Sequence, residues 1–213
     1  MKQVAVLGLG RFGRKLAVSL YENGADVMAV DKNEDIVENI SGSVTYAIRA
    51  DISNAEALKG LGLENMDTVV VGIGSELTSS IMAVMVSKEL GVPYVVAKAS
   101  DERMGAILKK IGADKIIYPE EETGERTARI LTSDSFMEFF DIDSNLCILE
   151  MKPKKEWLGK NLIELNLREK YKINVVAIKD DNKMSSFVDP KKPLEDDITL
   201  LVLTEKKDLK KLN

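Results

Sequence analysis

The stretch that decides the fold is Val4–Asp31, VAVLGLGRFGRKLAVSLYENGADVMAVD. It contains an apolar strand pattern, the motif GLGRFG at Gly8–Gly13, an amphipathic helical period and a second apolar strand pattern that ends at Asp31. This order of strand, glycine turn, helix and strand is the context that the GxGxxG fingerprint requires. The sequence therefore predicts that the chain begins with a Rossmann-like β–α–β unit.

The alternation continues well beyond this unit. Helical periods that stop at glycine, a residue suited to the left-handed C-cap, separate the apolar runs. Strands that are apolar throughout and alternate with helices indicate a parallel sheet covered on both faces. We predict an α/β domain with a doubly wound, parallel, six-stranded sheet. Its strands are expected at Val4–Leu7, Asp26–Val30, Val44–Ile48, Thr68–Val71, Val95–Ala99 and Lys115–Tyr118.

A second, smaller module follows. Pro119 ends the sixth strand, and a crossover helix opens at Glu120 and reaches about Leu131. We assign residues 1–134, crossover helix included, to the nucleotide-binding domain and residues 135–213 to an α+β module. The expected elements of this module are strands at Phe136–Ile142, Leu146–Met151, Asn174–Ile178, Met184–Val188 and Ile198–Thr204, a helix at Lys160–Tyr171, and a basic terminal helix.

Composition excludes several classes of protein. The 213 residues hold 30 Lys and Arg against 35 Asp and Glu, a net charge of −5, which argues against non-specific nucleic-acid binding. The chain has no His, so histidine triads and histidine-ligated zinc are excluded. The single Cys147 excludes an intrachain disulfide and favours a reducing compartment. The apolar runs are too short to span a bilayer, so any connection to a membrane is expected to come through a partner.

The glycine motif and the end of the second strand predict a nucleotide site. Gly8 permits the tight turn, Gly10 lets the backbone approach a phosphate, and Gly13 allows close packing of helix on strand. The start of the helix offers free N–H groups to phosphates. Asp31 is placed to accept both ribose hydroxyls and disfavours a 2′-phosphate, an argument that the neighbouring Lys32 weakens slightly.

Three further residues have two interpretations each. Arg11 can clamp a terminal phosphate with two hydrogen bonds or can be a solvated first-turn arginine. Asp51 can face the adenine or can be the N-cap of the helix that begins near Asn54. Lys98 is expected at the carboxyl edge of the sheet, where ligands bind, or is an ordinary surface lysine. Because the second module has no His, no reaction is evident.

Several segments resemble a known family. VAVLGLGRFG with ADIS at Ala50–Ser53, VVVGIG at Val69–Gly74 and YPEEETGERTARIL at Tyr118–Leu131 resembles an RCK (KTN) domain. LIELNLREKYKINVVAI at Leu162–Ile178 resembles the TrkA-C module. Together they are similar to the cytosolic regulatory subunits of Ktr/Trk-type potassium transporters.

The resemblance implies an allosteric gate rather than an enzyme, with ATP or ADP as ligand. NAD or NADH is the alternative ligand, in an NAD(H)-sensing regulator or an NAD(H)-dependent oxidoreductase. It implies Mg²⁺ or Ca²⁺ at Glu120 in a dimer interface, where the alternative is an acidic first helical turn. The nucleotide-binding positions that it implies are Gly8, Gly10, Arg11, Phe12, Gly13, Asp31, Lys32, Asp51, Ile52, Gly74 and Lys98.

For the second module, the resemblance suggests cyclic di-AMP at Arg168, Asn174 and Pro193, although Asn174 can simply begin a strand. It also implies a homodimer that assembles into a ring, commonly an octamer, beneath a membrane-embedded potassium-transporting subunit. The expected location is therefore cytoplasmic and peripheral to the membrane.

Overall fold

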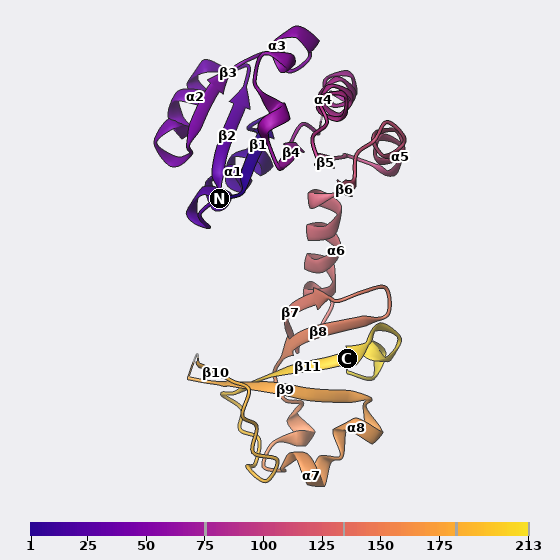
Figure 1. The fold of residues 1–213 in the computed structure, drawn as a ribbon. Helices are drawn as coiled ribbons and strands as arrows, with labels where there is room; N and C mark the ends of the chain where they lie inside the picture. The colour runs from indigo at the N-terminus through magenta and orange to yellow at the C-terminus, as the bar shows by residue number, and fades with distance from the viewer. Residues whose placement is uncertain (75, 134, 182, 213) are drawn as a thin grey trace. The chain divides into compact units, whose positions relative to one another are not determined.

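The computed structural model describes residues 1–74, 76–133, 135–181 and 183–212. Contacts divide the chain into two units, Met1–Glu121 and Glu122–Asn213, each described here by itself (Figure 1). The division falls within helix α6 (Pro119–Leu131), which the sequence analysis assigned as a whole to the first domain. Asp134, the last residue of that predicted domain, lies outside the described residues.

The first unit is built on the predicted parallel six-stranded sheet, in the order β3-β2-β1-β4-β5-β6. The order reverses between β1 and β4, and at such a switch point the carboxyl ends of the strands leave room for a ligand. The strands are β1 (Gln3–Leu7), β2 (Asp26–Asp31), β3 (Tyr46–Arg49), β4 (Thr68–Val71), β5 (Tyr94–Lys98) and β6 (Lys115–Ile117).

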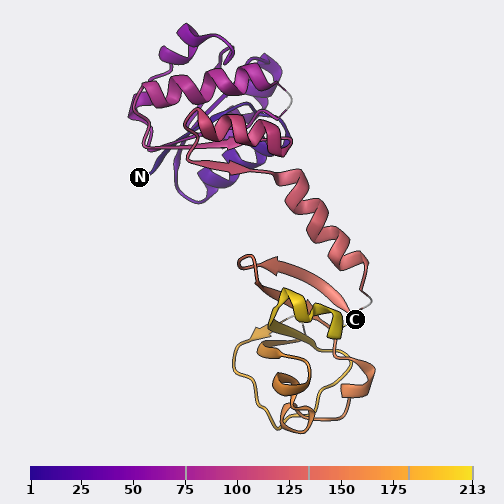
Figure 2. The ribbon, with the colours of Figure 1, turned by 90° about the vertical axis from the view of Figure 1, so that its right-hand side faces the viewer.

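Helices cover both faces of this sheet, which confirms the doubly wound class. Alternate residues of β1 face opposite layers: Ala5 and Leu7 pack toward α3, α4 and α5, while Val4 and Val6 pack toward α1 and α2. Figure 2 shows the face that α4 and α5 cover. The helices are α1 (Arg11–Glu22), α2 (Glu34–Ile40), α3 (Ala55–Lys59), α4 (Leu77–Glu89) and α5 (Glu102–Lys110), with single 3₁₀ turns η1 (Ser41–Ser43) and η2 (Leu63–Asn65).

Side-chain caps start three of these helices at the carboxyl edge of the sheet. Asn33, Asn54 and Asp101 accept hydrogen bonds from free N–H groups in the first turns of α2, α3 and α5. At the other ends, the glycines after α1, α4 and α5 have positive φ, as the sequence predicted. These caps fix the loops that surround the candidate site.

The second unit is the predicted α+β module. Its antiparallel sheet has the order β10-β9-β11-β8-β7 and packs one face on a core that contains Trp157 and Leu149. Its elements are β7 (Phe136–Asp141), β8 (Leu146–Met151), η3 (Lys155–Trp157), α7 (Leu162–Leu165), α8 (Leu167–Lys170), β9 (Ile173–Asp180), β10 (Lys183–Ser185), β11 (Thr199–Glu205) and η4 (Lys206–Lys211).

Two helix predictions for this unit were wrong. The helix predicted at Lys160–Tyr171 is two short helices, because Asn166 between them is left-handed, with φ of 45°. The basic terminal helix is the 3₁₀ helix η4 rather than an α-helix. Leu212, which caps the end of η4, is fully buried in the core, so packing holds a segment whose own helical tendency is weak.

Candidate functional site

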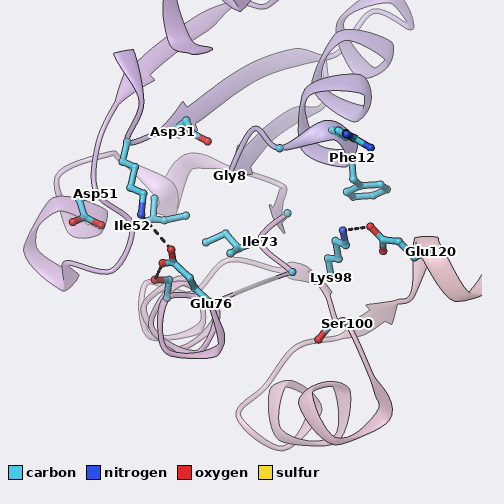
Figure 3. A pocket seen from close by; sticks show the side chains of 16 residues that line it. Gly8, Phe12, Asp31, Asp51, Ile52, Ile73, Glu76, Lys98, Ser100 and Glu120 are labelled. Atoms are coloured by element: carbon cyan, nitrogen blue, oxygen red, sulfur yellow. Dashed lines mark hydrogen bonds and ion pairs between the residues drawn. The ribbon is translucent and has the colours of Figure 1, made fainter. Parts of the chain in front are cut away.

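A cavity of about 730 Å³ opens at the carboxyl edge of the first sheet (Figure 3). It lies at the switch point between β1 and β4, where the fold leaves a crevice for ligands. Of the residues predicted to bind nucleotide, all except the packing glycine Gly13 line it. The lining residues are Gly8, Gly10, Arg11, Phe12, Asp31, Lys32, Asp51, Ile52, Gly72, Ile73, Gly74, Glu76, Ser79, Lys98, Ser100 and Glu120.

The three glycines of the motif differ in the reason why each position is glycine. Gly8 has φ of +93°, and its N–H donates to the Val30 carbonyl at 2.8 Å. A Cβ on Gly13 would lie 1.9 Å from the Gly8 carbonyl oxygen, so only glycine lets α1 approach this loop. A Cβ on Gly10 would meet no atom within 4 Å. Gly10 therefore has no packing reason to be glycine, and its open face lies on the cavity.

The start of α1 is prepared for an anion. Gly10 is its N-cap and supplies no side-chain cap, and no acidic residue occupies the first turn. The free N–H groups and the positive end of the helix dipole are thus left for a ligand. Arg11 lies beside them and is exposed. Among the described residues, no side chain forms an ion pair or hydrogen bond with its guanidinium.

The Asp31 carboxylate is held in place by backbone groups. Its Oδ2 accepts from the Leu9 N–H at 2.7 Å, and its Oδ1 accepts from the Asn33 N–H at 2.9 Å. Each carboxylate oxygen can accept a further hydrogen bond. The glycine loop and the loop after β2 therefore position an acceptor pair, which is what recognition of two ribose hydroxyls requires.

Asp51 does not cap the helix after it. The N-cap of α3 is Asn54, whose Oδ1 accepts from Glu56 and Ala57, so the capping interpretation of Asp51 was wrong. The Asp51 Oδ1 instead accepts from the Ser53 N–H and hydroxyl at 3.0 and 2.7 Å. These bonds lower the pKa of Asp51 below its ordinary value. An ionised carboxylate therefore lies on the cavity wall beside the buried Ile52.

Lys98 and Glu120 lie on the opposite side of the cavity from Asp31 and Asp51 (Figure 3). The Lys98 side chain is only 12% exposed, and its Nζ pairs with the Glu120 Oε1 at 2.5 Å. The same Nζ is 5.9 Å from the centroid of the Phe12 ring, and a Cβ on Gly74 would lie 3.0 Å from its Cε. Lys98 is thus not an ordinary surface lysine, and its hydrogen bond lowers the pKa of Glu120.

Five residues that line the cavity were not predicted from the sequence. Four follow the carboxyl ends of central strands, so the rule that ligands bind at that edge was the available signal. The fifth, Ser79, lies in the first turn of α4 and has no such signal. The Ser79 hydroxyl donates to Glu76 at 3.0 Å, and Glu76 is the N-cap residue of α4. The missed residues are Gly72, Ile73, Glu76, Ser79 and Ser100.

The second unit has a smaller cavity of about 350 Å³. Arg168 and Asn174 both line it, together with apolar residues of α7, α8 and β9 such as Ile163. Pro193, the third residue suggested for a ligand there, is not among the lining residues. The structure therefore brings two of these three side chains to one hollow.

Two kinds of site are absent from the part of the chain that the structure describes. No group of three or more Cys, Asp and Glu side chains is arranged to hold a metal ion. Glu120 thus offers one carboxylate, already paired with Lys98, and a single chain does not form a complete cation site there. No helix within the described ranges is both long enough and apolar enough to cross a membrane.

The fold and the cavity define a Rossmann-type protein with a crevice at its glycine loop and an appended α+β module. The TrkA-N domain family matches residues 4–119, and the TrkA-C domain family matches residues 148–213. The chain belongs to this TrkA-N/TrkA-C family, as its sequence indicated.

Sequence relatives agree with this assignment. The chain is 33% identical to Ktr system potassium uptake protein A of Bacillus subtilis (strain 168) over 99% of this chain and 95% of that protein. It is 37% identical to Ktr system potassium uptake protein C of the same organism, over 84% of this chain and 80% of the relative. The potassium uptake protein A of Vibrio alginolyticus is 39% identical over 84% and 81%.

Solved structures share the fold at lower identity. The GsuK RCK domain superposes with a TM-score of 0.67 at 16% identity, covering 99% of this chain and 46% of that chain. A GsuK channel described as bound to NAD superposes with a TM-score of 0.66 at 16% identity, covering 98% and 38%. These likenesses confirm the RCK fold.

Proposed function

We propose that this chain is a non-enzymatic, nucleotide-sensing subunit that regulates a membrane-embedded potassium transporter. The observation that carries the proposal is the charge distribution of the first cavity. Carboxylates at Asp31 and Asp51 lie on one side, whereas the α1 N-terminus, Arg11 and Lys98 supply positive charge elsewhere on its wall. An adenine nucleotide has the complementary polarity, with hydroxyls on its ribose and negative charge on its phosphates.

ATP and ADP differ at such a site only by the terminal phosphate. They share the ribose contacts of Asp31 and the backbone contacts of the glycine loop, so these cannot distinguish them. Arg11, free of protein partners among the described residues, is the side chain suited to a two-point contact with the extra phosphate. A ligand shifts a conformational equilibrium only through such a difference in affinity. Coupling of roughly 1–3 kcal/mol is typical of allosteric proteins.

The names of the relatives support the proposed partner. Three of them are called Ktr system potassium uptake proteins and align with most of this chain. We infer a cytoplasmic subunit, peripheral to the membrane, that forms homodimers within a ring, with an octamer as the expected size. The potassium-conducting part is supplied by a separate membrane subunit.

A divalent cation belongs to this proposal only in an assembly. Glu120 is 71% exposed in the single chain and offers one carboxylate. Mg²⁺ or Ca²⁺ prefers several oxygen ligands, so Glu120 would hold the ion together with oxygens from outside this chain. Such an ion would add positive charge beside the phosphates.

The decisive experiment is a calorimetric titration with ATP, ADP, NAD and NADH, with and without Mg²⁺ or Ca²⁺. Arg11→Ala is expected to weaken ATP at least about tenfold more than ADP, one charge-assisted hydrogen bond being worth ~1.5–3 kcal/mol. Arg14→Ala is the matched control, since Arg14 is exposed on the same helix and does not line the cavity. Equal losses for all ligands in Arg11→Ala would contradict the role of Arg11.

An NAD(H)-sensing regulator is the second candidate. The ordered Asp31 carboxylate suits the adenosine ribose of NAD equally well, and a fold neighbour is described as bound to NAD. Clear preference for NADH, without an effect of divalent cation, would favour this candidate. Oxidation of NADH with a substrate, followed at 340 nm, would instead favour a dehydrogenase.

The cavity of the second unit supports a separate proposal of cyclic di-AMP binding. Its apolar wall can contact a base, and Arg168 can pair with a phosphate. Titration of cyclic di-AMP against the wild-type protein and Arg168→Ala tests it. Binding that Arg168→Ala leaves unchanged would place the ligand elsewhere.

A further inference from the structure

An ion pair that the sequence did not predict spans one end of the first cavity. The Lys32 Nζ, from the loop after β2, lies 3.3 Å from the Glu76 Oε1, at the start of α4. The Glu76 Oε2 accepts a hydrogen bond from the buried Ser79, so both of its oxygens are engaged (Figure 3). The pair thus connects the loop after β2 with the start of α4, at the end of the cavity where Asp31, Asp51 and Ile52 lie.

Carboxylates outnumber cations at this end. Asp31, Asp51 and Glu76 contribute three, and Lys32 is the one cation that the described residues place among them. Asp51 and Glu76 are near enough for each to act on the other, because the Asp51 charge works against the hydrogen bonds that lower the Glu76 pKa. The Ser79 and Lys32 contacts prevail, and the pKa of Glu76 lies below its ordinary value.

Lys32 is otherwise the natural partner for a 2′-phosphate. It directly follows Asp31, the residue whose carboxylate is positioned for the ribose hydroxyls, and a basic residue near that point is how Rossmann sites accommodate the extra phosphate. In this structure, however, its ammonium is directed to Glu76. Glu76 therefore disfavours a 2′-phosphate in two ways. It pairs with Lys32, the cation that the phosphate would need, and it adds a negative charge that repels the phosphate.

We propose that Glu76 is a specificity-determining residue that excludes nucleotides phosphorylated at the ribose 2′ position. The inference rests on the proposed function, since it concerns the same nucleotide cavity. It assigns Glu76 a task distinct from that of Asp31. Asp31 binds the hydroxyls, while Glu76 prevents Lys32 from binding a phosphate in their place.

The strength of the free pair is not the basis of this selectivity. Lys32 and Glu76 are 64% and 53% exposed, and such surface pairs are worth only ~0–1 kcal/mol. Selectivity arises when a ligand covers the cavity and displaces water, because the same charges then interact more strongly. The effect is therefore expected in the ratio of ligand affinities rather than in protein stability.

The test uses AMP and adenosine 2′,5′-bisphosphate, which differ only in the 2′-phosphate, as competitors for ADP bound to the full-length protein. Wild type should prefer AMP. Glu76→Gln keeps an acceptor for Ser79 but removes the charge and releases Lys32, so the ratio of the two dissociation constants should move at least about tenfold toward the bisphosphate. Lys32→Ala added to Glu76→Gln should abolish most of this gain.

Glu89→Gln is the matched control, because it makes the same charge change on the same helix at an exposed residue away from the cavity. Its ratio should equal that of wild type. A Glu76→Gln ratio that also equals wild type, with ADP bound normally, overturns the inference and leaves the proposed function intact. Failure of the wild-type protein to bind ADP, NADH or ATP would overturn the proposed function itself.

Discussion

Two glycines of the same motif, Gly10 and Gly13, are expected to respond differently when each is replaced by alanine. Gly13→Ala should unfold the first unit more easily, whereas Gly10→Ala should leave its stability unchanged and weaken nucleotide binding. The contrast follows from what each new Cβ would meet. One meets backbone at 1.9 Å, and the other projects into open space on the cavity.

The size of the Gly13→Ala effect follows from the clash. The Gly8 oxygen must withdraw from 1.9 Å to at least 3.0 Å from the new Cβ, and it belongs to a backbone turn that the Gly8–Val30 hydrogen bond holds. Overpacking typically costs ~1–3 kcal/mol. A clash with a backbone oxygen, which cannot rotate away as a side chain can, belongs at the upper end of this range. Better helix propensity of alanine returns up to ~1 kcal/mol. A net loss of about 2 kcal/mol is expected.

Gly10→Ala involves neither a clash nor a change of helix propensity inside the helix. Gly10 has φ of −59° and ψ of −176°, which alanine adopts readily, and its Cβ would touch nothing. That Cβ occupies the approach of a phosphate to the α1 N–H groups, so ADP affinity should fall at least about tenfold. The structural role and the binding role of the motif are thereby separated.

The assay is thermal unfolding followed by circular dichroism, with nucleotide binding by calorimetry. At roughly 4 °C per kcal/mol, Gly13→Ala should lower the Tm of the first unit by about 8 °C. Trp157, the single tryptophan, is buried in the second unit, so its fluorescence reports that unit and should not shift. A Gly13→Ala protein as stable as wild type, or a Gly10→Ala protein that binds ADP normally, would refute the reasoning.

Three further outcomes are expected. Asp114 accepts from the Val95 N–H at 2.7 Å, which lowers its pKa below the ordinary value of 3.8. Its stabilisation is therefore present above about pH 4 and is lost as pH falls further, and Asp114→Asn should flatten an acid titration of the first unit's stability below that pH. Burial raises the pKa of the Cys147 thiol to about 11, so the native protein should resist alkylation at pH 8, a reaction followed by mass spectrometry, until denaturant is added. Asn54→Ala should cost ~1 kcal/mol in urea unfolding, while Asp51→Ala, which removes no helix cap, should cost less.

The first sheet was predictable because its signals are local. Each strand is a run of apolar residues, and a glycine follows several of the helices directly. The apolar runs, the helical periods and these glycines therefore sufficed to predict the order of elements. The sheet edge then brought residues as distant as Gly8, Asp31, Asp51 and Lys98 to one cavity. That convergence follows from the topology of a doubly wound sheet rather than from spacing along the chain.

Other features depend on side-chain encounters that no local pattern encodes. Glu76 and Lys32 are 44 residues apart, and neither has a neighbour in sequence that indicates the other. The break at Asn166 reflects tertiary packing that overrides a helical period, since buried Leu165 and Leu167 on either side both join the core. The Lys98–Glu120 pair likewise arises only when β5 and α6 are placed by the fold.

Some cavity residues are held in place by backbone groups and others by side chains, and this difference suggests which of them respond to the ligand. Gly8 and Asp31 are fixed by backbone geometry and backbone donors, so their contacts are the same for every adenine nucleotide. Lys98 is held by a single exposed carboxylate on the first turn of α6, the helix within which the two units divide. A phosphate that attracts Lys98 therefore competes with Glu120 for it. Under the proposed function, the number of phosphates is read by side chains whose partners can be exchanged, while the ribose is held by a carboxylate that backbone hydrogen bonds keep in place.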